Sequence, residues 1–120
     1  MSGSTIQFAL SDYTVSAVGP GPTVAVLPQS VSGRSLPPAI ICSIFGAPIY
    51  SVEITGDNVL APGYNAAAGV YVALATMNNL TMNAQQGLSV ICTGIRVRMS
   101  GGIGSVRFQF PQLNGLPSVY

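Results

Sequence analysis

Hydrophobic and polar positions alternate in short runs along this chain of 120 residues. Valine, isoleucine and tyrosine are frequent in these runs, and clusters of glycine, proline, asparagine and serine separate them. A period of two places successive side chains on opposite faces of a strand, so the pattern predicts β-structure. The expected strands are residues 5–10, 13–18, 23–27, 39–45, 49–55, 70–75, 79–82, 88–99 and 105–110, and the strand at 88–99 can be interrupted near Thr93 and Gly94.

The alternation is clearest in the last third of the chain. Apolar residues occupy every second position from 95 to 99, and the positions between them are Arg96 and Arg98. Beyond a glycine-rich stretch, three alternate positions continue the apolar face: Val106, Phe108 and Phe110. Gly101 and Gly102 lie between the two runs and can supply the positive φ angles of a type I′ turn, so we expect a tight hairpin here.

A succession of strands without a stable helix indicates an all-β fold. About eight strands suit an antiparallel β-sandwich or a jelly roll. The best helical candidate, residues 65–69, is too short to be stable alone and is expected to form a loop or a single turn. Residues 1–120 are expected to be a single β-domain with flexible arms at 1–11 and 111–120.

The composition restricts the partners. Hydrophobic residues make up 48% of the chain and charged residues only 6%, against about 25% charged residues in ordinary soluble domains. So few charges protect poorly against self-association, and we expect trimers or, failing that, dimers. Four arginines without lysine cannot neutralise the roughly 6–10 phosphates of a typical nucleic-acid site. No apolar run approaches the about 20 residues of a membrane span, so neither nucleic acid nor membrane is an expected partner.

Catalytic chemistry is also not expected. The chain has no histidine, which is the commonest general base and metal ligand. Glu53 and Asp57 are four positions apart on an expected strand, which separates them by roughly 13 Å, further than glycosidase carboxylates. Asp57 fits a turn better. We therefore expect a non-enzymatic protein without a cofactor.

Cys42 and Cys92 each lie within an apolar run. Free cysteine is among the most buried residue types, so we expect two buried, reduced thiols. A disulfide between the two is the alternative, because two cysteines permit a single pairing.

Six residues are expected at an interface: Arg96, Arg98, Arg107, Leu113, Leu116 and Tyr120. The expected hairpin brings the three arginines onto one face, where they need an acidic partner. That partner is either Glu53 within the domain or an acidic patch on another subunit, since arginine is enriched at interfaces. The other three residues are apolar and lie in the C-terminal arm, where docking on a neighbour would remove them from water.

Three segments resemble small virion structural proteins of tailed bacteriophages. They are Ser51 to Asp57, Asn79 to Thr81, and Gly94 to Ser100 with Gly104 to Gln112. The resemblance implies a small β-sandwich or jelly roll in a virion assembled in the host cytoplasm. It implies most specifically a head decoration or cement protein, whose partners are copies of itself and the major capsid protein.

Two alternatives stay open. A coat, tail or fibre subunit would fit the same residues. A carbohydrate- or receptor-binding β-sandwich would hold its ligand with Tyr50, Tyr64 and Tyr71, although no tryptophan is present for a stacking platform.

Overall fold

The computed structural model describes residues 8–27, 30–31, 34–35 and 38–113. The described residues form strands and one short 3₁₀ turn, and none of them is α-helical, so the all-β prediction is confirmed. In chain order the elements are β1 (Phe8–Val15), β2 (Gly19–Pro20), β3 (Val24–Ala25), β4 (Ser30–Val31), β5 (Arg34–Ser35), β6 (Ala39–Thr55), the 3₁₀ turn η1 (Ala66–Ala68), β7 (Val72–Ala73), β8 (Ala84–Gly87) and β9 (Gly94–Leu113).

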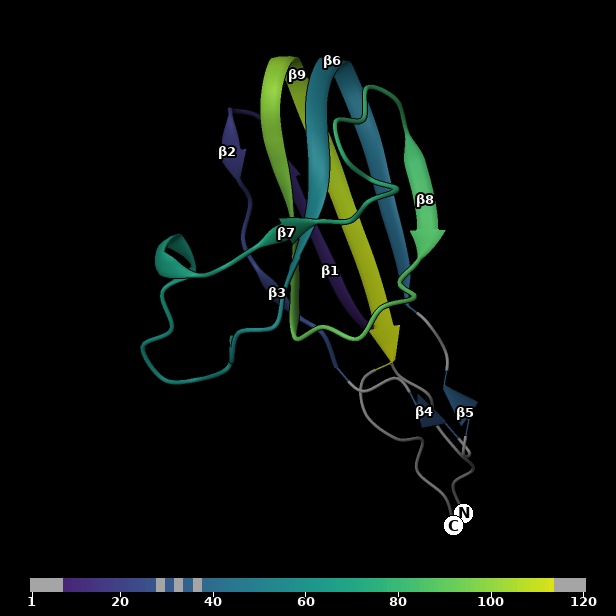
Figure 1. Ribbon diagram of the computed structural model, residues 1–120. Coiled ribbons are helices and arrows are strands. Elements are labelled where there is room, and N and C mark those ends of the chain that lie inside the picture. The colour runs from purple at the N-terminus through teal and green to yellow at the C-terminus, as the bar shows by residue number, and fades with distance from the viewer. Residues whose placement is uncertain (1–7, 28–29, 32–33, 36–37, 114–120) are drawn as a thin grey trace.

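Two long antiparallel strands, β6 and β9, carry the architecture. They pair along nearly their whole length, from Ile41 opposite Gln109 to Thr55 opposite Gly94. All other strands of the seven-stranded sheet attach to these two, while β4 and β5 form a separate pair. Both long strands arch over at the top of Figure 1, so the same two strands run through both halves of the fold.

The arch lies where the sequence places glycine. Gly46, Gly102 and Gly104 all have positive φ, and a Cβ at Gly102 or Gly104 would collide with a backbone carbonyl oxygen of β6. The hairpin prediction is therefore wrong, because the glycines bend β9 without reversing it. The expected strands at 39–45 and 49–55 are likewise two halves of β6. Each half keeps a partner across the bend, so neither strand has to end there.

The arch creates two layers from one sheet. The first layer contains β1, residues 105–113 of β9, residues 39–45 of β6, and β8. The second layer contains β2 and β3, residues 94–99 of β9, residues 50–55 of β6, and β7. One core cluster draws buried side chains from both layers, among them Ile40, Cys42, Tyr50, Val52, Ile95, Val97, Val106, Phe108 and Phe110. This arrangement is compatible with the predicted sandwich or jelly roll.

The segment after β7 covers the outer edge of β6. Val52 accepts from the N–H of Leu74 and donates to the carbonyl of Met77, and Tyr50 exchanges both backbone bonds with Leu80. Further along, the N–H of Ile44 donates to the side chain of Asn83. Most of this edge is therefore closed by irregular chain, which explains why the expected strands at 70–75 and 79–82 shrink to β7 and a single bridge.

Strand limits near the N-terminus and before β9 also differ from expectation. The described parts of the expected strands at 5–10 and 13–18 belong to the single strand β1, because Ser11 and Asp12 keep their partners in β9. Residues 5–7 lie outside the described residues. Residues 88–93 precede β9 without strand structure, which agrees with the break expected near Thr93. The segment 65–69 contains the single turn η1, as predicted.

The predicted terminal arms fall only partly within the described residues. Residues 8–11 and 110–113 are strand and pair with each other in one continuous register. The backbone of Leu113 lies opposite Phe8. Leu116 and Tyr120 lie outside the described residues.

Candidate functional site

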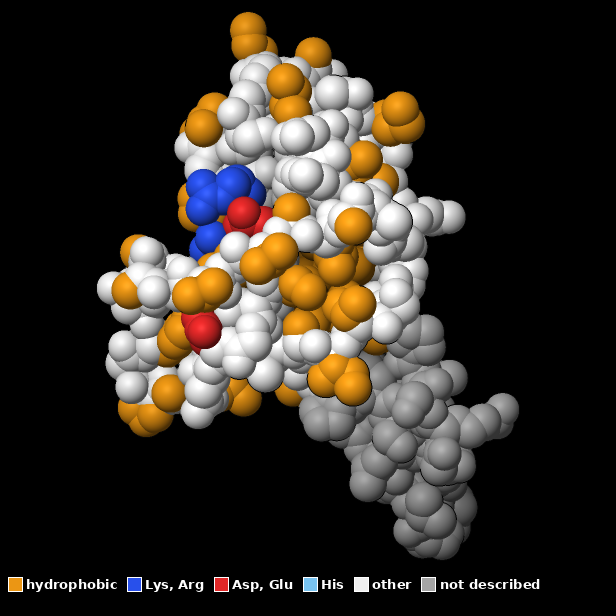
Figure 2. Space-filling model, in the orientation of Figure 1, with side chains coloured by type: hydrophobic (Ala, Val, Ile, Leu, Met, Phe, Trp, Pro, Cys, Tyr) orange, Lys and Arg blue, Asp and Glu red, His pale blue; other side chains and the backbone are white. Residues whose placement is uncertain are grey.

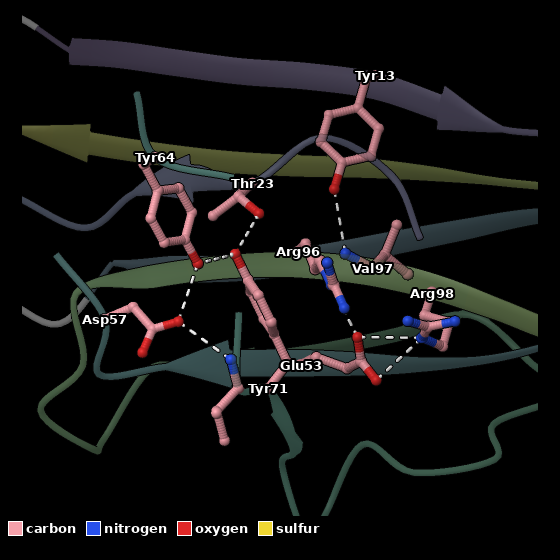
Figure 3. Close-up of polar contacts among 10 residues, drawn as sticks. Tyr13, Thr23, Glu53, Asp57, Tyr64, Tyr71, Arg96, Val97 and Arg98 are labelled. Carbon is pink, nitrogen blue, oxygen red and sulfur yellow. Dashed lines mark hydrogen bonds and ion pairs between the residues drawn. The ribbon is translucent and has the colours of Figure 1, made fainter. Parts of the chain in front are cut away.

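Glu53 binds two of the three clustered arginines. It lies on β6 directly opposite Arg96 of β9. Its carboxylate accepts from Arg96 Nε at 2.8 Å and from Arg98 Nε at 3.1 Å (Figure 3). The side chains of Glu53 and Arg96 are only 13% and 6% exposed, and the Arg96 guanidinium lies 3.6 Å from the centre of the Tyr71 ring. The alternative that placed the acidic partner of these arginines within the domain is thus confirmed for this pair.

Arg107 lies elsewhere. It belongs to the first layer and binds Asp12 of β1 through two hydrogen bonds, Nη2 to Oδ2 at 2.6 Å and Nε to Oδ1 at 3.0 Å. The hydrogen bond from this guanidinium is the main reason that the pKa of Asp12 is lowered. The expectation that the three arginines share one face is wrong, because the arch places Arg107 in the other layer from Arg96 and Arg98.

A polar network fastens the long loop after β6 to the second layer. The Tyr71 hydroxyl lies 2.7 Å from Thr23 Oγ1 and 2.9 Å from the Tyr64 hydroxyl (Figure 3). Tyr64 and the N–H of Val70 each donate to Asp57 Oδ2 at 3.0 Å. These two donors, with Val70 the larger cause, lower the pKa of Asp57. All five residues therefore have partners within the domain, and the network holds the loop in place.

The three tyrosines of the carbohydrate-binding alternative do not form a platform. Tyr50 is fully buried, and its hydroxyl donates to the carbonyl of Met82 at 2.7 Å. One face of the Tyr71 ring is covered by Arg96. A sugar would find no set of stacked, open aromatic rings here.

The two cysteines are separate thiols. Cys42 is buried and Cys92 is partly buried, and neither forms a disulfide. Burial raises the pKa of Cys42 to about 12 and also raises the pKa of Cys92. The prediction of free thiols is confirmed, with full burial at Cys42 alone.

The convex side of the arch exposes large apolar side chains that sequence reasoning missed. Phe45 is 81% exposed and Ile103 is 84% exposed, and Ile49 is partly exposed beside them. Ala47 lies directly opposite Ile103, so the group is continuous across the two strands. The sequence signal was the apolar alternation at 45, 47 and 49, which the expected strands at 39–45 and 49–55 divided between two strands. We call Phe45, Ala47, Ile49 and Ile103 the arch tip.

Charges and apolar side chains are distributed unevenly over the surface. On the face drawn in Figure 2, basic and acidic side chains lie in one small area, and hydrophobic side chains are scattered over the remaining described surface. The described arginine side chains of β9 are all engaged in ion pairs. The surface available to a partner is therefore mostly neutral.

The described residues contain no group of three or more metal-ligating side chains. No helix long and apolar enough to cross a membrane occurs in the described ranges.

Searches against protein-family models, curated proteins and solved structures find no match for the chain.

Proposed function

We propose that this chain is a non-enzymatic virion structural protein, most specifically a capsid decoration or cement protein that stabilises the head shell of a tailed bacteriophage. Its partners are copies of itself and the major capsid protein. The observation that carries the proposal is the arch tip, where Phe45 and Ile103 project into water while the arginines of β9 are neutralised within the domain.

The arch tip suits insertion into a pocket of a neighbouring subunit. Full burial of an apolar side chain of this size contributes about 1.5–3 kcal/mol. The ordering cost is small, because the backbone at the tip is already fixed by pairing between β6 and β9. A modest gain per copy is sufficient when many copies occupy a symmetric shell.

The resemblance noted in the sequence adds to this support. Among its segments, residues 51–55 of β6 pair with residues 94–98 of β9, and Gly104 to Gln112 pairs with β1 and with the first half of β6. A coat, tail or fibre subunit is supported by the same features, and the location of the chain within the particle separates these roles.

The test is quantitative mass spectrometry of virions purified from the source that encodes the chain. We expect this chain at an abundance close to that of the major capsid protein, and its absence from the particles would overturn the proposal. The double variant Phe45→Ser with Ile103→Ser should be lost from the particles. Leu60→Ser, which changes a 75% exposed residue in the loop after β6, is the matched control and should be incorporated normally.

A further inference from the structure

Strand β1 forms the longest edge that lacks a neighbour among the described residues. Its eight residues pair with β9 on one side, and no hydrogen bond joins its backbone to a third described strand. The other outer strands are short, with four residues in β8 and two each in β2, β3 and β7. The irregular segment after β7 covers the edge of β6.

The direction of the backbone groups in β6 and β9 follows from the ladder. The N–H of Ile44 points away from β9, because it donates to Asn83 on the other side of β6. The backbone N–H and C=O groups of successive residues point to opposite sides of a strand, so those of Ser43 point toward β9. Ser43 lies opposite Arg107. The backbone N–H and C=O groups of Arg107 therefore point toward β6, where they bond to those of Ser43.

The same alternation identifies the open groups of β1. Val106, the neighbour of Arg107, points toward β1 and lies opposite Val15. The odd-numbered residues of β1 consequently bond to β9, and the even-numbered residues direct their N–H and C=O groups to the open edge. The even-numbered residues whose side chains are described are Leu10, Asp12 and Thr14, and all three are exposed.

Within the part of the chain that the structure describes, the edge carries none of the usual protections against pairing with another chain. Exposed edge strands are commonly guarded by lysine, proline or a β-bulge. β1 contains neither lysine nor proline, and its register with β9 is unbroken. Its single charge, Asp12, is neutralised by Arg107. The open edge is therefore suited to pairing with another strand.

We propose that the β1 edge pairs with the β1 edge of a second copy of this chain, antiparallel and about a two-fold axis at Ser11. This register pairs every edge-facing residue of β1, because Leu10 then lies opposite Asp12 of the second copy and Phe8 lies opposite Thr14. It also keeps the two Asp12 side chains from facing each other, which like charges disfavour. The first layers of the two copies become one continuous sheet. The inference specifies the self-association contact and rests on the proposed function for its place in a shell.

Disulfide trapping in solution tests the register. At a two-fold axis on Ser11 the two Ser11 residues form a pair without hydrogen bonds, with Cα atoms about 4.5 Å apart, which a disulfide can bridge. In a Cys92→Ser background, Ser11→Cys should yield a covalent dimer as the main product of mild oxidation. Leu10→Cys is the matched control and should remain mostly monomeric, because its counterpart in the second copy is displaced by two residues. Equal trapping at both positions, or at neither, would overturn the register.

A second measurement tests the edge itself. Thr14→Pro removes an N–H that points to the open edge and spares the bonds to β9, whereas Thr14→Ala keeps that N–H. Sedimentation should show loss of the dimer for Thr14→Pro and its retention for Thr14→Ala, and a dimer in both would refute the contact.

If Thr14→Pro fails to fold, amide hydrogen exchange of the unaltered protein shows whether the contact between the two β1 edges forms. The amides of Leu10, Asp12 and Thr14 should exchange more slowly at high than at low protein concentration, and exchange that is independent of concentration would refute the contact. All these measurements use the isolated protein. Their failure therefore leaves the virion abundance test of the proposed function unaffected.

Discussion

The hydroxyl of Tyr13 accepts a hydrogen bond from the backbone N–H of Val97 at 3.0 Å. Tyr13 belongs to the first layer and Val97 to the second, so this bond crosses the core. Strand β2 ends at Pro20 and β3 begins at Val24, which leaves the N–H of Val97 in the gap between them. The tyrosine side chain thus occupies the place of a missing strand partner.

We expect Tyr13→Phe to lower the free energy of unfolding by about 1–3 kcal/mol, the usual effect of leaving a buried donor unsatisfied. Val97 is fully buried, so water cannot replace the lost acceptor without opening the edge. Urea unfolding measures the change. Thr14→Ala on the exposed face of the same strand is the control and should change the unfolding midpoint little. Equal midpoints for wild type and Tyr13→Phe would contradict the role of this bond.

Glu53→Gln should be more damaging, because it leaves the guanidinium of Arg96 buried without a counter-charge. Removal of one partner from a buried ion pair costs about 3–5 kcal/mol. The control is Asp12→Asn, which removes the partner of Arg107, whose side chain is 55% exposed, and it should have a much smaller effect. Thermal unfolding of both variants provides the comparison, and similar losses would show that the pair with Arg96 is not especially important.

Gly104→Ala should prevent the arch from forming normally. Gly104 has φ +126°, and an added Cβ would collide with the carbonyl oxygen of Phe45. Left-handed backbone alone costs a non-glycine residue about 1–2 kcal/mol, and the collision adds to this. The matched control is Gly101→Ala, where the nearest atom would be Ile49 Cδ1 at 3.6 Å and φ is not positive. A folded Gly104→Ala protein with the same melting temperature as Gly101→Ala would refute this account of the bend.

The Glu53–Arg96 pair could be anticipated from the sequence, whereas the bend at Gly101 and Gly102 could not. Glu53 could be named as one of two alternative partners of Arg96 because alternation assigns each residue a face, and the structure confirms this alternative. Gly101 and Gly102 were misinterpreted because two adjacent glycines fit a type I′ turn and a bent strand equally well. The choice depends on β6, about 50 positions earlier in the chain, and such long-range pairing leaves no local signal.

The sequence pattern also does not reveal that the arch tip and the edge of β1 are exposed. Ile103 continues the apolar alternation of the core residues Ile95, Val97 and Met99, and Phe45 ends an almost unbroken apolar run, so neither pattern marks an exposed side chain. Likewise, the patterns at 5–10 and 13–18 predict strands, yet the edge position of β1 depends on the order of strands in the sheet.

Cys42 provides a test of the core through its reactivity. The residue is 1% exposed, while Cys92 is only partly buried. A thiol-specific reagent at pH 8 should therefore modify Cys92 in the folded protein and reach Cys42 only when the protein unfolds. Thiolate is the reactive form, so the raised pKa of Cys42 slows its reaction further. Two equally fast reactions in the folded protein would contradict the burial of Cys42.

The same thiol should make the fold sensitive to alkaline pH. The pKa of Cys42 is raised from an ordinary value of 9.0 to about 12, so between these values the unfolded chain loses a proton that the folded chain keeps. Stability must then fall as the pH rises above 9, by up to about 1.4 kcal/mol per pH unit for this group. Burial of Tyr13, whose pKa is raised from 10.0 to about 12, adds a second loss that begins above pH 10.

Urea unfolding at pH 8, 9 and 10 separates the contribution of Cys42. Cys42→Ala should be less stable at pH 8, because it removes buried volume, yet its stability should decline less between pH 9 and 10 than that of the wild type. Cys92→Ala should keep most of the wild-type decline, since its thiol is less buried. A decline in Cys42→Ala as steep as in the wild type would show that the Cys42 thiol does not govern the loss of stability.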